Sequence, residues 1–458
     1  MTGEQRHVRA TQTGGRDATT GVIPGRYVLS VGLPDKAPPS GWRWTPLSAV
    51  ARLESGHTPS RSVPEYWDGD IPWIGIRDAT QNHGRTILKT NQTVTQAGIH
   101  NSSARVLPAG TVCLSRTASV GYVVVMGRPM ATSQDFVNWV CSDALDSRFL
   151  KYVLLSEHDS MLRFASGTTH QTIYYPEVKA FHVCLPEPAE QRTIAHILGT
   201  LDDKIELNRR TNKTLEAMAR ALFQSWFVDF DPVRAKHALS NVEGAESRDP
   251  CLPKEIADLF PDRFEDSELG EIPAGWEAGA VGDLAEVSSG KRPDVGYPEA
   301  SVEACVPLWG GNGPMAFVSK SLIDYPILLT GRVGTLGSVF RITSPCWPSD
   351  NTLILKATYP RAFEYLFLQL KRVDFASLNR GSTQPLLTQT DLKSQAVLLP
   401  PATVLERFHT FVKASYGRID ASEAESRTLA ALRDTLLPKL ISGELRVQDA
   451  ETIAEAAI

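Results

Sequence analysis

Two stretches with the same hydrophobic heptad pattern constrain this sequence more than any other feature. In residues 188–227 the pattern steps by four and three residues through Ile194, Leu198, Leu201, Ile205, Asn208, Asn212, Leu215, Ala219, Leu222 and Trp226. The same pattern recurs 214 residues later, at Phe408, Val412, Ser415, Ile419, Ser422, Ser426, Leu429, Arg433, Leu436 and Leu440. A heptad seam is narrower than the apolar stripe of a globular helix and is typical of a helix that pairs with another helix. We therefore predict two long helices that pair within the chain.

Both seams become polar at the same central place. Asn208 and Asn212 stand there in the first helix, and Ser422 and Ser426 in the second. An antiparallel pairing brings one polar centre against the other, and polar groups at core positions fix register and orientation at a cost in stability. Two unrelated amphipathic helices, each lying on its own domain, are the alternative. The matched polar centres favour an antiparallel coiled coil whose register these four residues set.

The composition is that of an ordinary globular protein with two or three domains. The chain has 458 residues, of which 42% are hydrophobic and 22% charged. Its net charge is −5, and the segment from Asp231 to Gly270, with ten acidic and five basic residues, accounts for all of it. Nucleic-acid-binding proteins usually carry a basic excess, so a nucleic-acid site in this chain has to be a local patch.

Cysteine spacing and hydropathy indicate a cytoplasmic protein with no metal and no cofactor. The six cysteines form no C-x-x-C pair, which argues against a zinc site and fits free thiols in a reducing compartment. Six of the ten histidines lie within residues 57–182, and none of these six has metal-ligand spacing. The sequence also lacks an apolar run near the roughly 18 residues of a membrane span and an N-terminal signal peptide.

The long helices belong to an internal repeat. Gly41-Trp42 recurs as Gly275-Trp276 at an offset of 234 residues, which falls to 216 and then to 214 further along the chain. In each copy, short β-branched runs precede a helical pattern and a final strand, which predicts a mixed α and β domain. The predicted order is a largely disordered leader at 1–40, a first domain at 41–187, a helix at 188–230, an acidic linker at 231–270, a second domain at 271–400, a helix at 401–447 and a tail at 448–458. The predicted fold class is α+β, with two similar domains joined by an antiparallel coiled coil in pseudo-twofold symmetry.

Such a chain imitates a dimer, and it suits a target that is elongated and nearly twofold. Duplex DNA is the leading candidate, because dimeric readers contact two half-sites about one helical turn apart. A non-catalytic scaffold, with two modules on a coiled-coil ruler that hold other proteins, is the alternative. Only a DNA reader needs its basic residues on one shared concave side, and these residues are Arg116, Lys291, Arg292, Arg332 and Arg380.

Several motifs resemble the specificity (S) subunits of type I restriction-modification systems, over about residues 40–447. The first half contains Trp44-Thr45-Pro46-Leu47, Gly56-His57-Thr58-Pro59, Asp70-Ile71-Pro72-Trp73-Ile74, Leu107-Pro108-Ala109-Gly110-Thr111, Ser133-Gln134-Asp135-Phe136, and Leu185-Pro186 with Glu190-Gln191 and Ile194. The remainder contains Trp226-Phe227-Val228-Asp229-Phe230-Asp231-Pro232-Val233, Leu269-Gly270-Glu271-Ile272-Pro273 with Gly275-Trp276, and Leu432-Arg433-Asp434 with Leu436-Leu437-Pro438-Lys439-Leu440 and Ser442-Gly443. The second helix departs from the pattern because it opens without the Glu-Gln pair. If that pair docks a partner subunit, the second helix lacks this docking feature.

The resemblance implies a DNA-recognition subunit without catalysis, in which each target recognition domain reads one half of a bipartite target. It also implies two methyltransferase subunits, acting on adenine N6, and restriction subunits held through them. The sequence agrees, because it has neither the Asn/Asp-Pro-Pro-Tyr/Phe motif of an adenine methyltransferase nor a Walker A loop. Glu177-Val178-Lys179 matches the Glu-x-Lys of nuclease centres, but it stands alone before a predicted strand. These absences argue against a fused nuclease and methyltransferase.

Candidate DNA contacts are polar side chains on loops that could reach a groove. Arg and Lys suit guanine, Asn and Gln suit adenine, and Ser and Thr suit phosphates. The candidates of the first domain are His57, Thr58, Ser60, Arg61, Arg77, Arg116, Thr117, Ser119, Thr168, Thr169 and Gln171. Those of the second domain are Lys291, Arg292, Asn312, Arg332, Arg380, Ser382, Thr383 and Gln384. The repeat pairs Arg116 with Arg332 and favours these two and the Gly-Thr/Ser-Thr loops, while a turn or a surface salt bridge is the alternative for any single residue.

Overall fold

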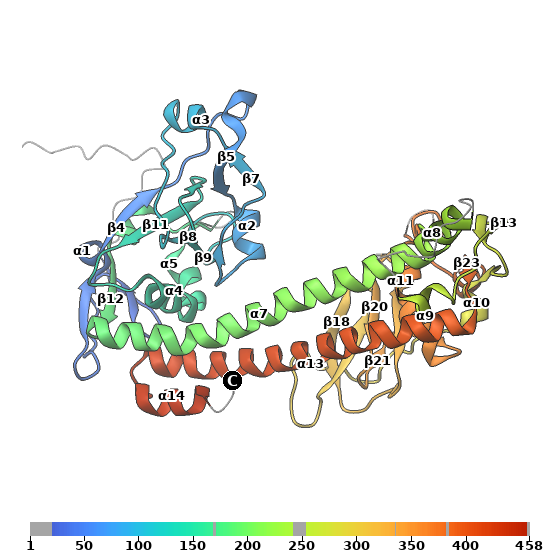
Figure 1. Ribbon diagram of the computed structural model, residues 1–458. Coiled ribbons are helices and arrows are strands. Elements are labelled where there is room, and N and C mark those ends of the chain that lie inside the picture. Colours follow the sequence, from blue (N-terminus) through green and yellow to red (C-terminus); the bar gives the residue numbers. More distant parts are fainter. Residues whose placement is uncertain (1–20, 168–170, 241–252, 335, 382–383, 456–458) are drawn as a thin grey trace, which may run out of the picture. The chain divides into compact units, whose positions relative to one another are not determined.

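The computed structural model describes residues 21–167, 171–240, 253–334, 336–381 and 384–455 (Figure 1). They form two compact units, the first within Met1–Asn208 and Ala424–Ile458, and the second within Arg209–Glu423. Both predicted long helices are present as α7 (Pro188–Phe227) and α13 (Ala402–Ile441), with 40 residues each. The boundary between the units lies inside both helices, so each unit contains one mixed domain and a part of each helix.

In the first unit the seam of α7 is buried against the seam of α13. One core contains Ile194, Leu198, Leu201, Leu429, Leu436 and Leu440. Asp202 accepts a hydrogen bond from Arg433, whereas Asn208, later in α7, donates to Ser426, earlier in α13, at 3.2 Å. The helices are therefore antiparallel in this unit, as predicted. Asn208 also donates to Glu425 at 2.7 Å, so its amide is satisfied inside the seam.

The second unit contains the other half of the same pairing. Its core includes Ala219, Phe223, Trp226, Phe408, Val412 and Ile419. The Phe408 ring packs against Trp226, with centroids 6.0 Å apart, whereas Arg220, earlier in α7, lines a pocket with Tyr416, later in α13. The antiparallel coiled coil is thus confirmed in this unit too. The Asn212 side-chain oxygen is buried with no hydrogen-bond partner among the described residues.

The first domain has three sheets and short helices. The main sheet has the order β4-β11-β8-β9-β6, from β4 (Ala51–Ser55), β11 (Phe136–Cys141), β8 (Val112–Ser115), β9 (Val123–Met126) and β6 (Thr86–Ile87). The other two are β10 (Ala131–Thr132), β5 (Trp67–Ile74) and β7 (Gln92–Val94), and β1 (Ile23–Pro24), β2 (Leu29–Val31), β12 (Phe181–Leu185) and β3 (Arg43–Pro46). The helices are α1 (Leu47–Val50), η1 (Pro64–Tyr66), α2 (Ile76–Gln81), α3 (Gln96–His100), α4 (Ser147–Ser156), α5 (His158–Phe164) and α6 (Tyr175–Lys179).

The second domain repeats this plan, which confirms the internal repeat. Its main sheet has the order β16-β22-β19-β20, from β16 (Ala285–Ser289), β22 (Thr352–Ala357), β19 (Ile327–Gly331) and β20 (Val339–Ile342). The other sheets are β18 (Gly313–Val318), β17 (Val306–Gly310) and β21 (Trp347–Pro348), and β15 (Glu277–Ala280) with β23 (Ala396–Leu399). The helices are α10 (Val281–Leu284), η2 (Pro360–Ala362), α11 (Phe363–Leu370) and α12 (Gln389–Lys393).

The described part of the predicted leader differs from the expectation of disorder. Residues 21–40 contain β1 and β2, and β2 pairs with β12 of the first domain. Glu157 is fully buried, and its carboxylate accepts hydrogen bonds from the backbone N–H groups of residues 26–29 at 2.6–3.2 Å. A buried carboxylate is stable only with such partners, so this contact fixes the segment on the domain.

The predicted acidic linker and tail also contain regular structure. The linker region holds α8 (Asp231–Ser240), α9 (Lys254–Ala257), β13 (Phe264–Ser267) and the start of β14 (Gly270–Pro273). Phe260 packs its ring between Trp226, at 5.1 Å, and Trp276, at 6.0 Å between centroids. In the tail, α14 (Val447–Glu455) buries Ala450 and Ala454 in the core of the first unit. Apolar side chains among the charges explain both differences, because each segment has a face to bury.

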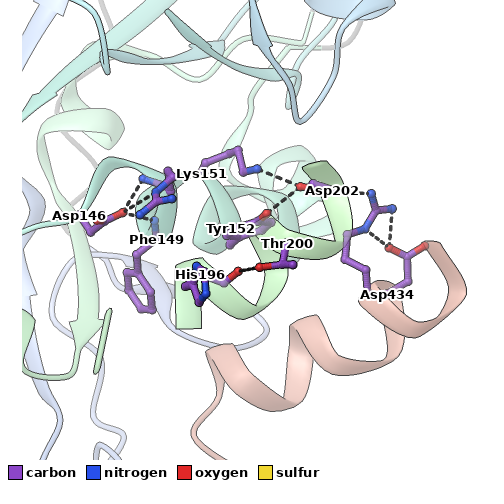
Figure 2. Close-up of polar contacts among 10 residues, drawn as sticks. Asp146, Phe149, Lys151, Tyr152, His196, Thr200, Asp202 and Asp434 are labelled. Atoms are coloured by element: carbon purple, nitrogen blue, oxygen red, sulfur yellow. Dashed lines mark hydrogen bonds and ion pairs between the residues drawn. The ribbon is translucent and has the colours of Figure 1, made fainter. Parts of the chain in front are cut away.

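The carboxylate of Asp202 on α7 joins three helices of the first unit (Figure 2). It accepts hydrogen bonds from Lys151 Nζ at 3.0 Å and the Tyr152 hydroxyl at 2.7 Å, both on α4, and from Arg433 Nη1 on α13 at 2.8 Å. Burial raises the pKa of Asp202, but Lys151 and Arg433 outweigh it and hold the pKa below its ordinary value. A charged Asp202 therefore orients the first domain on its part of the helix pair.

In the second unit a different charged cluster ties the domain to α13. Arg341 on β20 donates to both carboxylate oxygens of Asp420 on α13, at 2.8 and 2.9 Å. Arg341 also lies 3.8 Å from Glu364 on α11, and Glu364 pairs with His409 of α13 at 2.6 Å. These residues do not stand at the repeat positions of Asp202 and its partners, so the two domains are anchored by different side chains.

Candidate nucleic-acid interface

At one end of the first domain, the chain after β4 crosses the segment that follows β10. The His57 N–H donates to Thr132 O at 2.9 Å, and the Trp73 indole N–H donates to His57 O at 3.1 Å. A Cβ atom at Gly56 would lie 1.9 Å from Ser133 O, so the backbones can approach this closely only at glycine. The Gly56-His57 motif therefore marks a backbone crossing that sets the position of the loop behind it.

The second domain has the same crossing at the equivalent positions. The Lys291 N–H donates to Pro348 O at 3.0 Å, and the Trp347 indole N–H donates to Lys291 O at 2.8 Å. A Cβ atom at Gly290 would lie 2.1 Å from Ser349 O. The glycines paired by the sequence repeat thus do the same work in both domains, and the loops after them start from the same place.

A pocket in the first domain brings two of the predicted loops together. Its lining includes Arg61, Trp73, Gly75, Ile76, Arg77, Asp78, Asn91, Gln92 and Asp135. The loop of Arg116 adjoins this pocket, because the Arg116 N–H donates to Asp135 O at 2.8 Å. Three of the four loops predicted from the sequence therefore meet at one place, which combines basic, acidic and amide groups.

Arg61 has a defined place in this pocket. Its guanidinium carbon lies 4.6 Å from the ring centroid of Trp67 and 5.5 Å from that of Trp73, within cation–π range. Its Nη2 donates to Gln92 Oε1 at 3.2 Å. The two indoles meet edge to face, with centroids 5.2 Å apart, so Arg61 rests on an aromatic support.

Asp78 is held as an acceptor inside the pocket wall. It is 4% exposed, and its carboxylate accepts from Gly75 N–H at 2.9 Å and from both the backbone and the side-chain N–H groups of Asn91, each at 2.8 Å. These bonds close the N-terminus of α2, which carries the exposed Arg77. Asp78 is therefore a positioning group for α2 and for the amide of Asn91.

Sequence reasoning missed the two amides of this pocket. Asn91 and Gln92 stand at the start of β7 and face Asp78 and Arg61 through the hydrogen bonds above. Their residue type gave a signal, since Asn and Gln are adenine readers. Nothing in the linear sequence places them beside Arg61, because β7 reaches the pocket only through its pairing with β5.

Arg116 follows β8 directly, and its peptide group is held on both sides. Besides the bond to Asp135, its carbonyl accepts from Ile173 N–H at 2.8 Å. The residue is 8% exposed, its guanidinium lies 4.8 Å from the Tyr175 ring centroid, and its Nε has no hydrogen-bond partner in the described chain. A buried donor without a partner costs free energy. This geometry fits a site that a ligand completes better than it fits a surface salt bridge.

Arg332 repeats these contacts in the second domain. It follows β19 directly, its N–H donates to Asn351 O, and its carbonyl accepts from Leu387 N–H, both at 2.8 Å. Asn351 and Leu387 stand at the repeat positions of Asp135 and Ile173. The Arg332 Nε is likewise buried without a hydrogen-bond partner among the residues that the structure describes. The pairing of the two arginines, inferred from spacing, thus extends to their backbone contacts.

Several predicted residues of the first domain are engaged within their own turns. The Thr117 hydroxyl bonds with that of Thr172 at 2.8 Å, and the Ser119 carbonyl accepts from Ser115. In the first loop, Thr58 donates to the side chain of Gln134, and the Ser60 and Ser62 hydroxyls lie 2.8 Å apart. The turn role, left open by the sequence, describes these four candidates, whereas Gln171 is exposed.

In the second domain, Arg380 occupies a surface salt bridge. Its Nε and Nη2 donate to the same Asp391 oxygen at 3.1 and 2.9 Å, so Arg380 has to leave Asp391 before it can meet another anion. The exposed candidates of this domain are Lys291, Arg292, Asn312 and Gln384. Four further candidates lie outside the described residues, namely Thr168, Thr169, Ser382 and Thr383.

The Glu-Gln pair at the start of α7 has an internal contact. Gln191 is 1% exposed, accepts from Asp146 N–H at 3.0 Å, and donates to Ala144 O and Pro186 O at 3.1 and 3.0 Å. The residue at its repeat position in α13 is Leu405, which is buried in the core of the second unit. Gln191 is therefore a structural staple, and its absence from the second helix removes no exposed glutamine.

The search for other kinds of site was limited to the described residues. Among them, no group of three or more His, Cys, Asp or Glu side chains is arranged to hold a metal ion. No helix of the described chain is long and apolar enough to cross a membrane. Glu177, the acid of the Glu-x-Lys sequence, is 4% exposed and lies in α6.

The sequence matches the family described as type I restriction modification DNA specificity domain, over residues 39–217 and 273–413. It is 28% identical over 437 residues to the type I restriction enzyme MjaIX specificity subunit of Methanocaldococcus jannaschii, covering 90% of this chain and 95% of that protein. It is 27% identical over 387 residues to the HindI specificity subunit of Haemophilus influenzae, covering 70% and 84%. The crystal structure of a type I restriction-modification S subunit from M. genitalium superposes with a TM-score of 0.56 at 16% identity, covering 88% of this chain and 97% of that one.

Proposed function

Because the chain belongs to the family of type I restriction modification DNA specificity domains, we propose that its two domains read the two halves of one bipartite DNA target. The chain is a DNA-recognition subunit without catalysis of its own. The observation that carries the proposal is the repeated backbone crossing at Gly56 and Gly290, which gives both domains equivalent loops at the same end. Beside it, each domain presents a buried arginine with an unsatisfied donor, Arg116 in one and Arg332 in the other.

The chemistry of these loops suits base edges in a groove. Arginine offers paired donors to guanine, and asparagine and glutamine offer a donor and an acceptor to adenine. The first domain holds Arg61, Asn91 and Gln92 around one pocket, and the second exposes Lys291 and Arg292 after its crossing. Local basic groups of this kind can bind DNA although the chain carries a net charge of −5.

The partners follow from the same family membership. We propose that two methyltransferase subunits, which methylate adenine at N6, bind the chain, and that restriction subunits are held through them. The names of the relatives, which are specificity subunits of type I restriction enzymes, support this assembly. The complex then acts in the cytoplasm, where its DNA target is found. A pseudo-twofold relation between the halves, predicted from the repeat, gives each methyltransferase subunit a similar site.

The experiment that tests this function is a selection on methylated DNA. The chain is co-purified with its methyltransferase subunits and incubated with S-adenosylmethionine and a library of random DNA duplexes. Methylated duplexes are recovered with an antibody against N6-methyladenine and sequenced. We expect two constant blocks separated by a spacer of fixed length and random sequence. A single contiguous block, or methylation without any preferred sequence, would contradict the reading by two domains.

The scaffold alternative predicts a different result from the same preparation. A scaffold would hold the methyltransferase subunits together, and the methylated sequences would then not depend on this chain. Replacing residues 271–400 with the corresponding domain of a relative separates the two cases. If the chain reads DNA, one of the two constant blocks changes and the other stays. If it is a scaffold, both blocks stay as they were.

A further inference from the structure

Arg61 differs from the other basic candidates because its guanidinium is oriented before any ligand arrives. The indole of Trp67 donates to Ser60 O at 3.2 Å, and that of Trp73 donates to His57 O at 3.1 Å, so hydrogen bonds to the backbone fix both rings beneath Arg61. Trp73 is only 4% exposed. The arginine therefore rests on a rigid surface, and little side-chain entropy remains to be lost when it binds.

The hydrogen bonding of Arg61 leaves most of its donors available. Within the described chain, its guanidinium has one hydrogen-bond partner, the Oε1 of Gln92 at 3.2 Å. Arginine carries five N–H donors in a planar fork. No carboxylate is recorded within ion-pair distance of Arg61 in the described chain, in contrast to Arg380, which Asp391 occupies. The charge of Arg61 is thus not neutralised by an ion pair in the unbound protein.

The second domain lacks this device. At the offset of 234 that pairs the two glycine crossings, Arg61 corresponds to Val295, which is 58% exposed. A valine has no polar group with which to read a base. The crossing itself is equivalent in both domains, so the difference lies in the side chains that the loops present. The two domains therefore cannot recognise their half-sites by the same contact at this position.

From these observations we propose that Arg61 is a specificity-determining residue that reads one guanine in the half-site of the first domain. The inference rests on the proposed function, because it names the base that one of the two domains recognises. A planar guanidinium with free donors makes two parallel hydrogen bonds to guanine O6 and N7 in the major groove, and no other base offers two acceptors there. Gln92 holds the guanidinium in plane from one side, and Trp67 and Trp73 support it from below.

The same geometry also allows one competing role, a contact to a phosphate. Arginine binds phosphate through the same fork. The two roles differ in what they predict, because a phosphate contact carries no sequence information. Loss of a phosphate contact weakens binding to all sequences and reduces the slope of log affinity against log salt by about 1. Loss of a base contact removes the preference at one position only.

The test uses the whole chain assembled with its methyltransferase subunits and the random duplex library. We compare the parent with Arg61→Ala, Arg61→Lys and the matched control Arg128→Ala. Arg128 is an exposed arginine of the same domain that lies outside the pocket. The parent should select an invariant guanine in one half-site, and Arg61→Ala should lose that preference by about 5- to 150-fold, the range of a good bidentate contact. The lysine variant should lose part of it, and the control none.

A second measurement asks whether Arg61 and the guanine act together. The selected guanine is replaced by 7-deazaguanine, which keeps the base pair but lacks the N7 acceptor. Binding by the parent should weaken on this change, whereas binding by Arg61→Ala should not weaken further, because the contact is already gone. Tryptophan fluorescence of each variant checks that Trp67 and Trp73 stay packed.

The outcomes separate this inference from the proposed function. If the parent selects a bipartite target and Arg61→Ala keeps the same guanine, Arg61 does not read it and the inference is wrong. Equal weakening on all sequences, with a smaller salt slope, assigns Arg61 to a phosphate and also overturns it. If the parent itself selects no sequence, the proposed function fails together with the inference. Only the loss of one guanine from one half-site, with the other half-site unchanged, supports it.

Discussion

Replacing Asp202 with asparagine should destabilise the first unit far more than an ordinary surface substitution. Asp202 accepts hydrogen bonds from Lys151, Tyr152 and Arg433 and thereby connects α4 of the first domain with α7 and α13 (Figure 2). The amide keeps the size of the carboxylate but removes its charge. The two cations it faces then lose their shared counter-charge, while the packing of the helices stays the same.

The expected cost follows from the burial of this group. The Lys151 side chain is 9% exposed and that of Asp202 is 22% exposed. Removing one partner of a buried ion pair costs about 3–5 kcal/mol, because the other charge remains buried without compensation. Since Asp202 retains some contact with water and the amide oxygen can still accept one hydrogen bond, we expect the low end of the range, about 3 kcal/mol.

The pH dependence provides a second signature. The pKa of Asp202 is lowered in the folded state, so its contribution is present above its ordinary pKa and is lost as the pH falls through the folded pKa. Burial lowers the pKa of Lys151, and Asp202 opposes that shift. Without Asp202, Lys151 releases its proton more readily on folding. The stability difference between parent and variant should therefore shrink both in acid and as the pH approaches the ordinary pKa of lysine, 10.5.

The assay has to report on the first unit alone, because a chain with two compact units need not unfold in one step. Amide hydrogen exchange of α4, followed by mass spectrometry, measures the free energy of opening of this helix. The matched control is Asp203→Asn, the neighbouring exposed carboxylate of α7, which should change stability by less than about 0.5 kcal/mol. A second control, Lys151→Met with Asp202→Leu, removes both charges and should recover most of the loss. Equal effects of the Asp202 and Asp203 variants would refute this reasoning.

Three further predictions concern function. Arg116→Ala should weaken recognition of one half-site and Arg332→Ala the other, each by about 1–3 kcal/mol for a base contact, and unchanged binding by both over a range of salt would remove them from the interface. The isolated chain should neither methylate nor cleave DNA and should support adenine methylation only with a methyltransferase subunit and S-adenosylmethionine, which methylation by the purified chain alone would disprove. Adding four residues near Asn208–Asn212 and four near Ser422–Ser426 lengthens each helix by about 6 Å and should lengthen the selected spacer by one or two base pairs at about 3.4 Å each, whereas two residues should break the seam. An unchanged spacer with retained binding would exclude the ruler.

The sequence was sufficient for the features that depend on periodicity and repetition. The heptad seams predicted both long helices and their pairing, because the faces that a helix buries are set by spacing alone. The repeat predicted two similar domains, and it singled out Gly56 and Gly290 before their backbone crossings were known. The departures occurred where apolar residues are few and irregularly spaced, as in residues 21–40, which fold only because the carboxylate of Glu157 accepts their N–H groups.

The site depended on contacts between residues far apart in sequence. Arg61 and Arg116 looked alike as loop arginines, yet one lies exposed on Trp67 and Trp73 while the other is buried over Tyr175. Spacing fixes which face of a helix or strand a side chain occupies. It does not fix what comes to lie opposite that face, because the partner is brought there by strand pairing and domain packing. The candidate residue types were therefore determined by the sequence, and their chemical surroundings were decided by the tertiary structure.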